Sequence, residues 1–299
     1  MVSILTTAVL VGLLYSLVTI GLCVAFRVLD YPDLTLEGGM VFGAAASLLT
    51  LQATGNVSLS LLAGLVAGAM AGGITASLHL FLGVSRLLSG IVTAALLYSV
   101  NIRLLGKLSV VRYSNGPTLF TPNPYVAQPQ LKSIFLLLLI AGSFVVLLAL
   151  FFRTRAGLLL RGMGEDERFV IAQGANPKAY LVGGLAVANA LIGLCGALVF
   201  HFHRVVDVNL TAGMLIAGLA ALVLGETLIP SRYLWQYLCA CVVGTLAYQA
   251  FVTLVLFGMG RVLSDVIIAS DVRLLTGLCF VGPYVVLRRR RYRLFYSRW

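Results

Sequence analysis

Charge, and negative charge above all, is scarce in this chain. Only 10% of its 299 residues are charged and only ten are Asp or Glu, whereas 60% are hydrophobic. Soluble globular domains contain about 25% charged residues, so the composition excludes an ordinary soluble domain. Residues 4–26 form an uncharged run that is long enough to cross a bilayer and lacks the basic start of a cleaved signal peptide. The sequence therefore predicts a polytopic membrane protein.

Side chains that build catalytic and metal sites are also few. The chain has three histidines and five cysteines, and it has no Gly-x4-Gly-Lys-Ser/Thr phosphate loop. Each cysteine lies in an apolar segment without a partner at metal-ligand or disulfide spacing, which favours small buried thiols. No nucleophile with a histidine and an acid, and no pair of carboxylates around a cleft, can be assembled. We predict no catalytic residue, no metal ligand and no enzyme.

Nine apolar runs between charged interruptions are candidate crossings. Three of them, 38–51, 87–102 and 274–287, are short for a hydrocarbon core of about 30 Å, which favours broken, tilted or protein-buried helices. We predict an all-α membrane fold with about nine transmembrane helices in one domain (1–299): a first half (1–152), a loop (153–178), a second half (179–287) and a basic tail (288–299). The nine runs are residues 4–26, 38–51, 59–81, 87–102, 133–152, 179–200, 210–228, 233–260 and 274–287.

The basic residues are distributed as membrane orientation requires. The net charge is +11; eight of the 21 basic residues flank one side of the predicted crossings, and six arginines follow residue 287 on that same side. Cytoplasmic loops are enriched in Lys and Arg, so the bias predicts a cytoplasmic C-terminus and an external N-terminus. Because the basic residues are not interleaved with aromatics on one soluble face, nucleic acid is not a predicted partner.

Two stretches of the chain resemble each other. DLTLEGGM (33–40) aligns with DVNLTAGM (207–214) at a shift of 174 positions, with four identities, and a helix rich in small residues follows each. Five crossings separate the two copies, so they would point in opposite directions, which is the inverted repeat of many transporters. Four identities in so biased a composition are also compatible with chance. The repeat predicts path-lining residues, which are Asp33, Thr35, Glu37, Gly38, Gly39, Asp207, Asn209, Thr211 and Gly213.

The acids of the first copy have different expected roles. Asp33 and Asp207 each precede a predicted helix, where a carboxylate accepts a backbone N–H and lies at the positive end of the helix dipole. Glu37 lies a turn inside its helix. An unpaired charge there is costly in lipid and marks a cavity, an ion pair or an ion path, so Glu37 is the acid predicted to matter for function.

The loop 153–178 is the one sizeable segment of mixed charge. GEDE (164–167) has the acids of a first helical turn, and GANP (174–177) has a C-cap glycine followed by proline. This pattern predicts one helix of about two turns on the cytoplasmic side.

Several motifs of this loop and of the first half resemble a known family. RTRAG (153–157), RGMGEDE (161–167), GAN (174–176) and GLCGA (193–197) occur in that order, and DYPDLTLEG (30–38) precedes them. In this order they are similar to the integral-membrane permeases of bacterial ATP-binding-cassette importers related to the branched-chain amino acid and ribose permeases. The resemblance covers nearly the whole chain. Ala175 in place of the usual isoleucine and the arginine-rich tail depart from the family pattern.

The resemblance implies a permease subunit in the bacterial plasma (inner) membrane, in which two copies form a translocation path for an amino acid or similar small organic molecule. It implies two cytoplasmic ATPase subunits, which hold the ATP and Mg, an extracytoplasmic binding protein, and no cofactor on this chain. The loop would be the ATPase-coupling segment, with Arg161, Gly164, Glu165, Asp166, Glu167, Phe169, Gly174 and Asn176 as its contact residues. An ion-coupled secondary transporter that uses Glu37, Asp33 and Asp207 is the alternative.

A few other polar residues have weaker assignments. His201 and His203 with Asp207 have metal-like spacing, but histidines beside an external loop are more often solvated, which is the reading we favour. His79, alone in an apolar run, is expected to make an interhelical hydrogen bond. Glu226 is expected to pair with Arg232, and the loop 106–132 is expected to be a platform for the binding protein.

Overall fold

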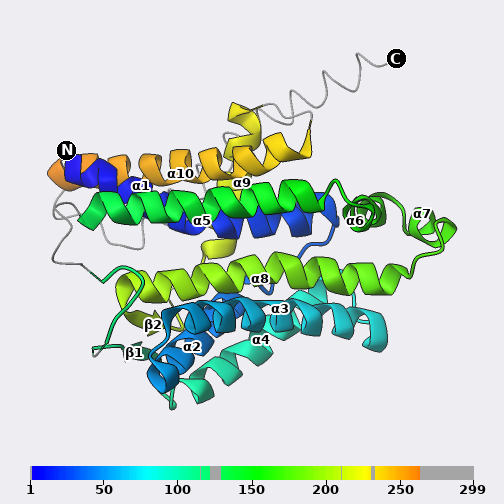
Figure 1. The fold of residues 1–299 in the computed structure, drawn as a ribbon, viewed down its shortest axis with the longest axis horizontal. Coiled ribbons are helices and arrows are strands. Elements are labelled where there is room, and N and C mark those ends of the chain that lie inside the picture. Colours follow the sequence, from blue (N-terminus) through cyan, green and yellow to red (C-terminus); the bar gives the residue numbers. More distant parts are fainter. Residues whose placement is uncertain (1, 115, 122–128, 210, 230–232, 263–299) are drawn as a thin grey trace. The chain divides into compact units, whose positions relative to one another are not determined.

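The computed structural model describes residues 2–114, 116–121, 129–209, 211–229 and 233–262, and they are almost entirely helical (Figure 1). Seven helices are long and apolar enough to cross a membrane. The elements, in chain order, are α1 (Val2–Leu22), continued by a π-helical stretch η1 (Cys23–Val28), α2 (Leu36–Thr54), α3 (Val57–Leu82), α4 (Arg86–Leu104), β1 (Val110–Arg112), α5 (Pro129–Phe151), α6 (Arg155–Glu165), α7 (Glu167–Ala172), α8 (Pro177–His203), β2 (Val205–Asp207), α9 (Met214–Leu228) and α10 (Leu234–Val262).

The predicted all-α membrane fold is confirmed. Eight of the nine predicted crossings coincide with helices of the structure, namely α1 to α5 and α8 to α10, while 274–287 and the basic tail lie outside the described residues. The predicted crossing 210–228 becomes α9, which has only 15 residues and is shorter than the seven spanning helices. The halves 1–152 and 179–287, and the inverted relation between them, stay predictions.

The chain forms two compact units, each assembled from separate stretches of sequence. One contains Met1–Thr19, Gln130–Val146 and Ile216–Trp299, and the other contains Ile20–Pro129 and Leu147–Leu215. In the first unit, α9 and α10 cross at Gly225 and Gly244, where a Cβ on either glycine would overlap the backbone of the other helix. Thr245 Oγ1 of α10 also donates to Thr19 Oγ1 of α1, at 2.8 Å.

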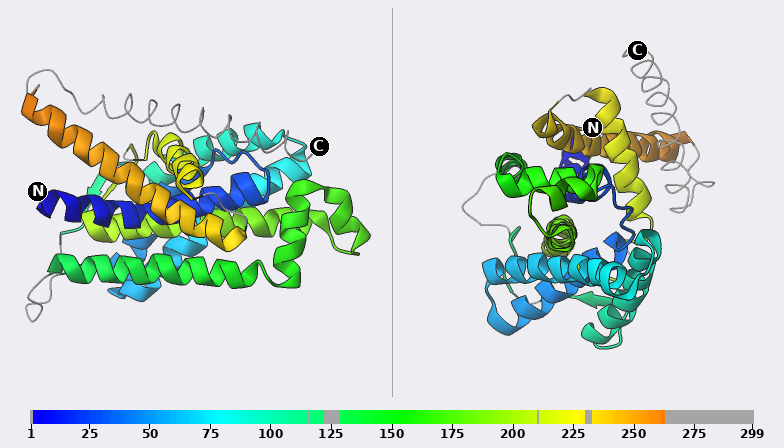
Figure 2. Two further views of the ribbon diagram at one scale, coloured as in Figure 1. Left: turned by 90° about the horizontal axis from the view of Figure 1, so that it is seen from above. Right: turned by 90° about the vertical axis from the view of Figure 1, so that its right-hand side faces the viewer.

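In the second unit, α8 lies at the centre, with α2 and α3 packed against it (Figures 1 and 2). The backbones touch through glycine: a Cβ on Gly43 would overlap the backbone of Gly193, and one on Gly196 would overlap the carbonyl of Met40. Small residues allow this approach in lipid, where helices associate by packing and hydrogen bonding. Successive glycines of α3 meet α8 at steadily lower residue numbers, so α3 runs antiparallel to α8.

Helix α3 buries its small side chains and exposes its large apolar ones. Its buried positions are nearly all small and recur at helical spacing: Ser60, Gly64, Ala67, Gly68, Ala71, Gly72, Thr75 and Ala76. Its large apolar side chains, such as Leu62, Val66 and Met70, are more than half exposed. This is the reverse of a soluble amphipathic helix, and it fits a helix whose outer face contacts lipid.

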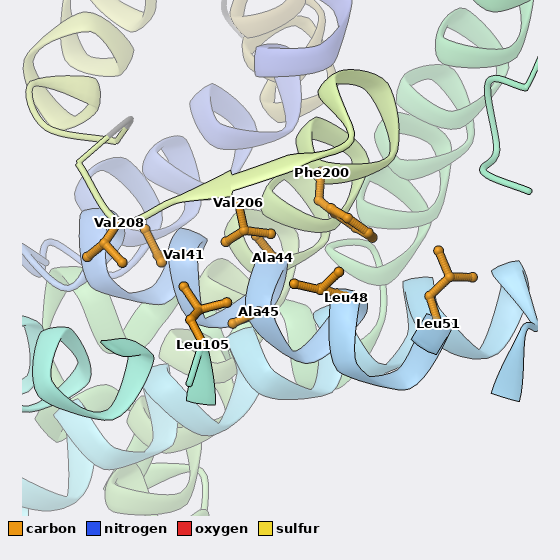
Figure 3. Packing of buried hydrophobic residues seen from close by; sticks show 9 residues of the cluster. All are labelled: Val41, Ala44, Ala45, Leu48, Leu51, Leu105, Phe200, Val206 and Val208. Atoms are coloured by element: carbon orange, nitrogen blue, oxygen red, sulfur yellow. The ribbon is translucent and has the colours of Figure 1, made fainter. Parts of the chain in front are cut away.

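A larger apolar cluster closes one end of the second unit (Figure 3). Val206 and Val208, from β2 and the residue after it, lie on the face of α2 that carries Val41 and Leu48, beside Phe200 of α8. β2 also pairs antiparallel with β1, with Val111 opposite Val206. No strand was predicted here, and the prediction of a loop over 106–132 was wrong at 110–112, which form β1, and at 129–132, which begin α5. The valine pairs at 110–111 and 205–206 favour extended structure. They come together as paired strands only when the chain folds.

Close packing at the glycines of α8 has a direct test. We expect Gly196→Ala to lower the free energy of unfolding by roughly 1–3 kcal/mol, as overpacking does in cores, because its Cβ would collide with the Met40 carbonyl. The matched control is Gly183→Ala on the same helix, whose Cβ meets nothing within 4 Å and which removes a helix-weakening glycine. Thermal unfolding of the purified chain in mild detergent measures both. Equal stability of the two variants would contradict the packing account.

Candidate functional site

The turn between α1 and α2 places a carboxylate deep inside the second unit. Pro32 disfavours helical geometry at the residue before it, and the chain turns through Asp30, whose φ is 49°. Asp33 follows and is only 2% exposed. Its Oδ1 accepts the backbone N–H of Thr35 at 2.9 Å. The N-cap position of α2 is Thr35, so the prediction that Asp33 caps the helix is wrong: its carboxylate orders the turn before it.

The other oxygen of Asp33 reaches a residue that the sequence analysis did not predict. Asn189 of α8 donates its Nδ2 to Asp33 Oδ2 at 2.5 Å. Asn189 is fully buried and lies near the middle of the 27-residue helix α8, which is about 40 Å long at 1.5 Å per residue. A lone amide in an otherwise apolar run was the available signal, because a polar side chain at membrane depth needs a partner.

Two threonines, Thr35 and Thr75, complete this buried cluster. Thr35 Oγ1 is 2.7 Å from Thr75 Oγ1 of α3, and Thr75 donates to the carbonyl of Ala71 at 3.1 Å. Asn101 of α4 donates to the carbonyl of Gly38 at 3.1 Å. We call Asp33, Thr35, Thr75 and Asn189 the polar cluster. It joins the start of α2 to the middle of α8 and to α3.

Glu37 has a partner from the second copy of the repeat. Its Oε1 accepts the backbone N–H of Gly213 at 2.8 Å, so it is not an unpaired charge in lipid. Gly213 has a φ of 89°, a left-handed conformation that glycine adopts without strain. The contact ties the first turn of α2 to the segment that leads into α9.

The two repeat motifs share their local turn. Asp207 Oδ1 accepts the N–H of Asn209 at 2.8 Å, as Asp33 does from the residue two positions on. The helices that follow begin differently: α2 starts three residues after Asp33, whereas α9 starts seven residues after Asp207. The left-handed Gly213 lies in between and delays the helix. The same local bond occurs at Asn56, Asp166 and Asn176, so the repeat stays a prediction.

The predicted path residues are therefore brought together only in part. The first copy forms one connected group around the start of α2, and Gly213 joins it through Glu37. Thr211 is buried, while Asn209 is exposed and Asp207 is half-buried. Asp207 has its own local turn. Among the described residues, no group of three or more His, Cys, Asp and Glu side chains is arranged to hold a metal ion.

The loop 153–178 contains two helices where one was predicted. α6 begins after Thr154, whose side chain accepts the N–H of Gly157, and ends at Glu165. Asp166 is extended and accepts the N–H of Arg168 at 2.9 Å, which makes it the N-cap of α7. The predicted start of the short helix at Gly164 is thus wrong by three residues. α6 was missed because its glycines and arginines weaken the apolar pattern.

The two helices lie at one end of the second unit (Figure 1). Their charged residues are exposed. A Cβ on Gly164 would overlap the Val28 carbonyl, so α6 lies tightly against the end of η1, and Val170 of α7 is fully buried. Gly174 (φ 73°) ends the segment, and Asn176 caps α8 by accepting the N–H of Lys178. An open hollow of about 580 Å³ on this surface is lined by Leu158, Arg161, Gly162, Glu165, Asp166 and Phe169.

His201 and His79 differ from their predicted roles, whereas His203 is exposed as predicted. His201 is fully buried at the end of α8, where its Nε2 lies 2.9 Å from Ser60 Oγ and 3.4 Å from Ser47 Oγ, so the prediction of a solvated side chain is wrong for it. His79 Nδ1 lies 2.6 Å from the carbonyl of Val84, in the turn that follows its own helix, instead of bonding to another helix. Arg232, the predicted partner of Glu226, lies outside the described residues.

Apolar helices around a buried polar cluster, with a charged helical segment at one end, define a multi-pass membrane transport protein. The chain belongs to the family of branched-chain amino acid transport system permease components, whose family model matches residues 4–276. This confirms the resemblance seen in the motifs, and it makes the chain a permease subunit of an ATP-binding-cassette importer for small solutes.

Two relatives match most of the chain, and one of them is described as a transport permease. The chain is 28% identical to a tyrosine transport system permease protein of Clostridioides difficile (strain R20291) over 273 residues, which cover 91% of this chain and 87% of that protein. It is 27% identical to an uncharacterized protein of Rickettsia prowazekii (strain Madrid E) over 255 residues, which cover 82% of this chain and 86% of that protein. No solved structure matches the chain significantly.

The link between Glu37 and Gly213 predicts a difference between two substitutions. Glu37→Ala leaves the Gly213 N–H without its acceptor, and we expect a loss of roughly 1–2 kcal/mol in the free energy of unfolding. Glu37→Gln keeps a carbonyl oxygen in the same place, so it should lose less than half as much. Unfolding of the purified chain in detergent tests this. If the Gln variant is as unstable as the Ala variant, the charge of Glu37, and not the hydrogen bond, holds the segment.

Proposed function

We propose that this chain forms the translocation path for an amino acid or a similar small organic molecule and that the path runs by the polar cluster. The observation that carries the proposal is the buried group of Asp33, Thr35, Thr75 and Asn189 near the middle of α8. Polar side chains at membrane depth are costly and mark substrate pathways, and transporter sites lie near the midplane at discontinuous helices. The name of the Clostridioides difficile relative supports an amino acid as the solute.

The proposed transport cycle is alternating access driven by partners. Separate cytoplasmic ATPase subunits would bind ATP and Mg, hydrolyse the ATP and dock on the α6–α7 surface, where Arg161, Glu165, Asp166 and Phe169 line an open hollow. An extracytoplasmic binding protein would deliver the solute at the opposite end of α8, near β1 and β2. A second copy of the chain would complete the path as a homodimer.

The two ends of α8 support this orientation. α6 and α7 pack near its N-terminal end, where exposed basic residues such as Arg153, Arg155 and Arg161 are found. Basic loops favour the cytoplasm. We therefore place α6 and α7 on the cytoplasmic side of the bacterial plasma membrane, the C-terminus on that side as well, and His203, β1 and β2 outside.

Uptake by membrane vesicles tests the energy source. We expect import of a radiolabelled amino acid such as tyrosine to require ATP and the binding protein, and to persist when ionophores collapse the proton and sodium gradients. Uptake that survives ATP depletion and disappears with either gradient would instead support an ion-coupled transporter that uses Glu37, Asp33 and Asp207.

Charge reversal on the proposed docking surface tests the coupling segment. We expect Glu165→Lys combined with Asp166→Lys to abolish co-purification of the ATPase with the permease, because both acids are exposed at the hollow between α6 and α7. The matched control is Glu165→Gln with Asp166→Asn, since Asn also serves as an N-cap and keeps α7 in place. Recovery of an intact complex from the doubly reversed variant would place the ATPase contact elsewhere.

A further inference from the structure

The polar cluster has one feature that transport of a neutral solute does not explain. Its carboxylate is 2% exposed, yet within the described part of the chain no Lys or Arg side chain is ion-paired with Asp33. The two partners of the carboxylate are the Thr35 N–H and the Asn189 amide. A buried carboxylate is ordinarily paired with a cation or coordinates one, so this charge lacks its usual compensation.

A second buried oxygen beside it has no partner at all. Asn189 Oδ1 is buried and accepts no hydrogen bond, although buried polar atoms are nearly always satisfied. Turning the amide over would not help, because it would place its oxygen against the Asp33 carboxylate, and two acceptors repel each other. An ionised Asp33 therefore keeps the Asn189 amide oriented with its oxygen facing away and without a hydrogen-bond donor.

There is room for one more atom next to that oxygen. A Cβ added to Gly39 would lie 3.4 Å from Asn189 Oδ1 and 3.6 Å from Ala71 Cβ, both ordinary contact distances. At Gly68 and Gly72, which pack against the same stretch of α8, an added Cβ would overlap backbone. Gly39 thus borders a small space that the surrounding helices leave open.

The hydroxyls of the cluster also present acceptors. Thr75 Oγ1 lies 3.1 Å from the Ala71 carbonyl, to which it can donate, and 2.7 Å from Thr35 Oγ1, where either hydroxyl can be the donor. Each hydroxyl oxygen also has lone pairs that can accept a hydrogen bond or bind a cation. A carboxylate, an amide oxygen and two hydroxyl oxygens make the cluster rich in acceptors, which favours a cationic group over an anionic one.

We propose that the polar cluster binds a small monovalent cationic group, which is either an alkali metal ion or the ammonium group of a transported solute. Both carry a positive charge and bind to oxygen atoms, so the cluster would recognise them in the same way. The inference rests on the proposed function only in placing this cluster along the transport path. In the conformation described, the cluster is closed to solvent, so a solute enters it when the helices move.

Thermal unfolding of the purified full-length permease in detergent tests the site without ATP or ATPase. At constant ionic strength, NaCl and methylammonium chloride are each titrated against choline chloride, whose cation has no N–H donor and is too large. We expect one of the two to raise Tm by about 2–4 °C at saturation, as mass action predicts for a ligand that binds the folded state. A response to Na⁺ identifies a free metal ion, and a response to methylammonium alone identifies an ammonium group. No response to either overturns the proposal.

Three variants test whether an increase in Tm arises from a cation bound at the polar cluster. Asp33→Asn removes the charge but keeps an acceptor for Thr35, and its new amide can donate to a reversed Asn189, so it should fold and lose the response. Gly39→Ala, whose Cβ makes only ordinary contacts, should fold and weaken the apparent affinity at least tenfold. Asp30→Asn, three residues earlier on an exposed side chain, should keep the full response. A response that survives in both Asp33→Asn and Gly39→Ala overturns the assignment.

Failure of the cation site can be distinguished from failure of the proposed import function. If ATP-driven uptake is intact in vesicles while the purified permease shows no cation response, the cation site is wrong and the importer function stands. If the cation response is intact while uptake does not depend on ATP, the importer function is wrong and the site stands.

Discussion

The close approach of α2, α3 and α8 is the constraint on which the rest of the described structure depends. In lipid, helices gain little from burying apolar side chains against one another, so backbone contact and hydrogen bonds hold them together. Gly43, Gly193 and Gly196 let the three backbones touch. Because the helices are so close, short polar side chains such as those of Asp33 and Asn189 can reach across from one helix to the next.

That closeness also explains why the chain can leave helical structure at membrane depth. α2 begins level with the middle of α8, and the residues before it form a turn whose backbone is hydrogen-bonded by the Asp33 carboxylate. After β2, the described residues up to Gly213 form turns, and Val206 and Val208 of this segment are buried against α2. Irregular backbone is tolerated at such depth only where protein covers it and satisfies its polar groups. Here the carboxylates of Asp33 and Glu37 supply two of the acceptors.

The segment formed by α6 and α7 is held in place by a few local contacts. α6 and α7 are short, and helices of this length are not stable alone, so their position depends on Gly164 at the end of η1, on the buried Val170 and on caps at Thr154 and Asp166. The outward side remains charged and open. The segment is therefore fixed on its inner side and polar on its outer side.

The sequence alone determined the membrane class, eight of the helices and the family, because long uncharged runs, basic flanks and the ordered motifs of 153–176 are local properties of the chain. It also identified Asp33, Glu37 and the repeat at Asp207 as a related set. Only the tertiary structure determined which residues form hydrogen bonds with them. Asn189 lies 156 residues from Asp33, and Gly213 lies 176 residues from Glu37. The strands β1 and β2 also pair although they are far apart in the sequence. Such contacts depend on how the helices pack. The packing depends on which glycines of separate helices lie against each other, and this cannot be read from any local sequence pattern.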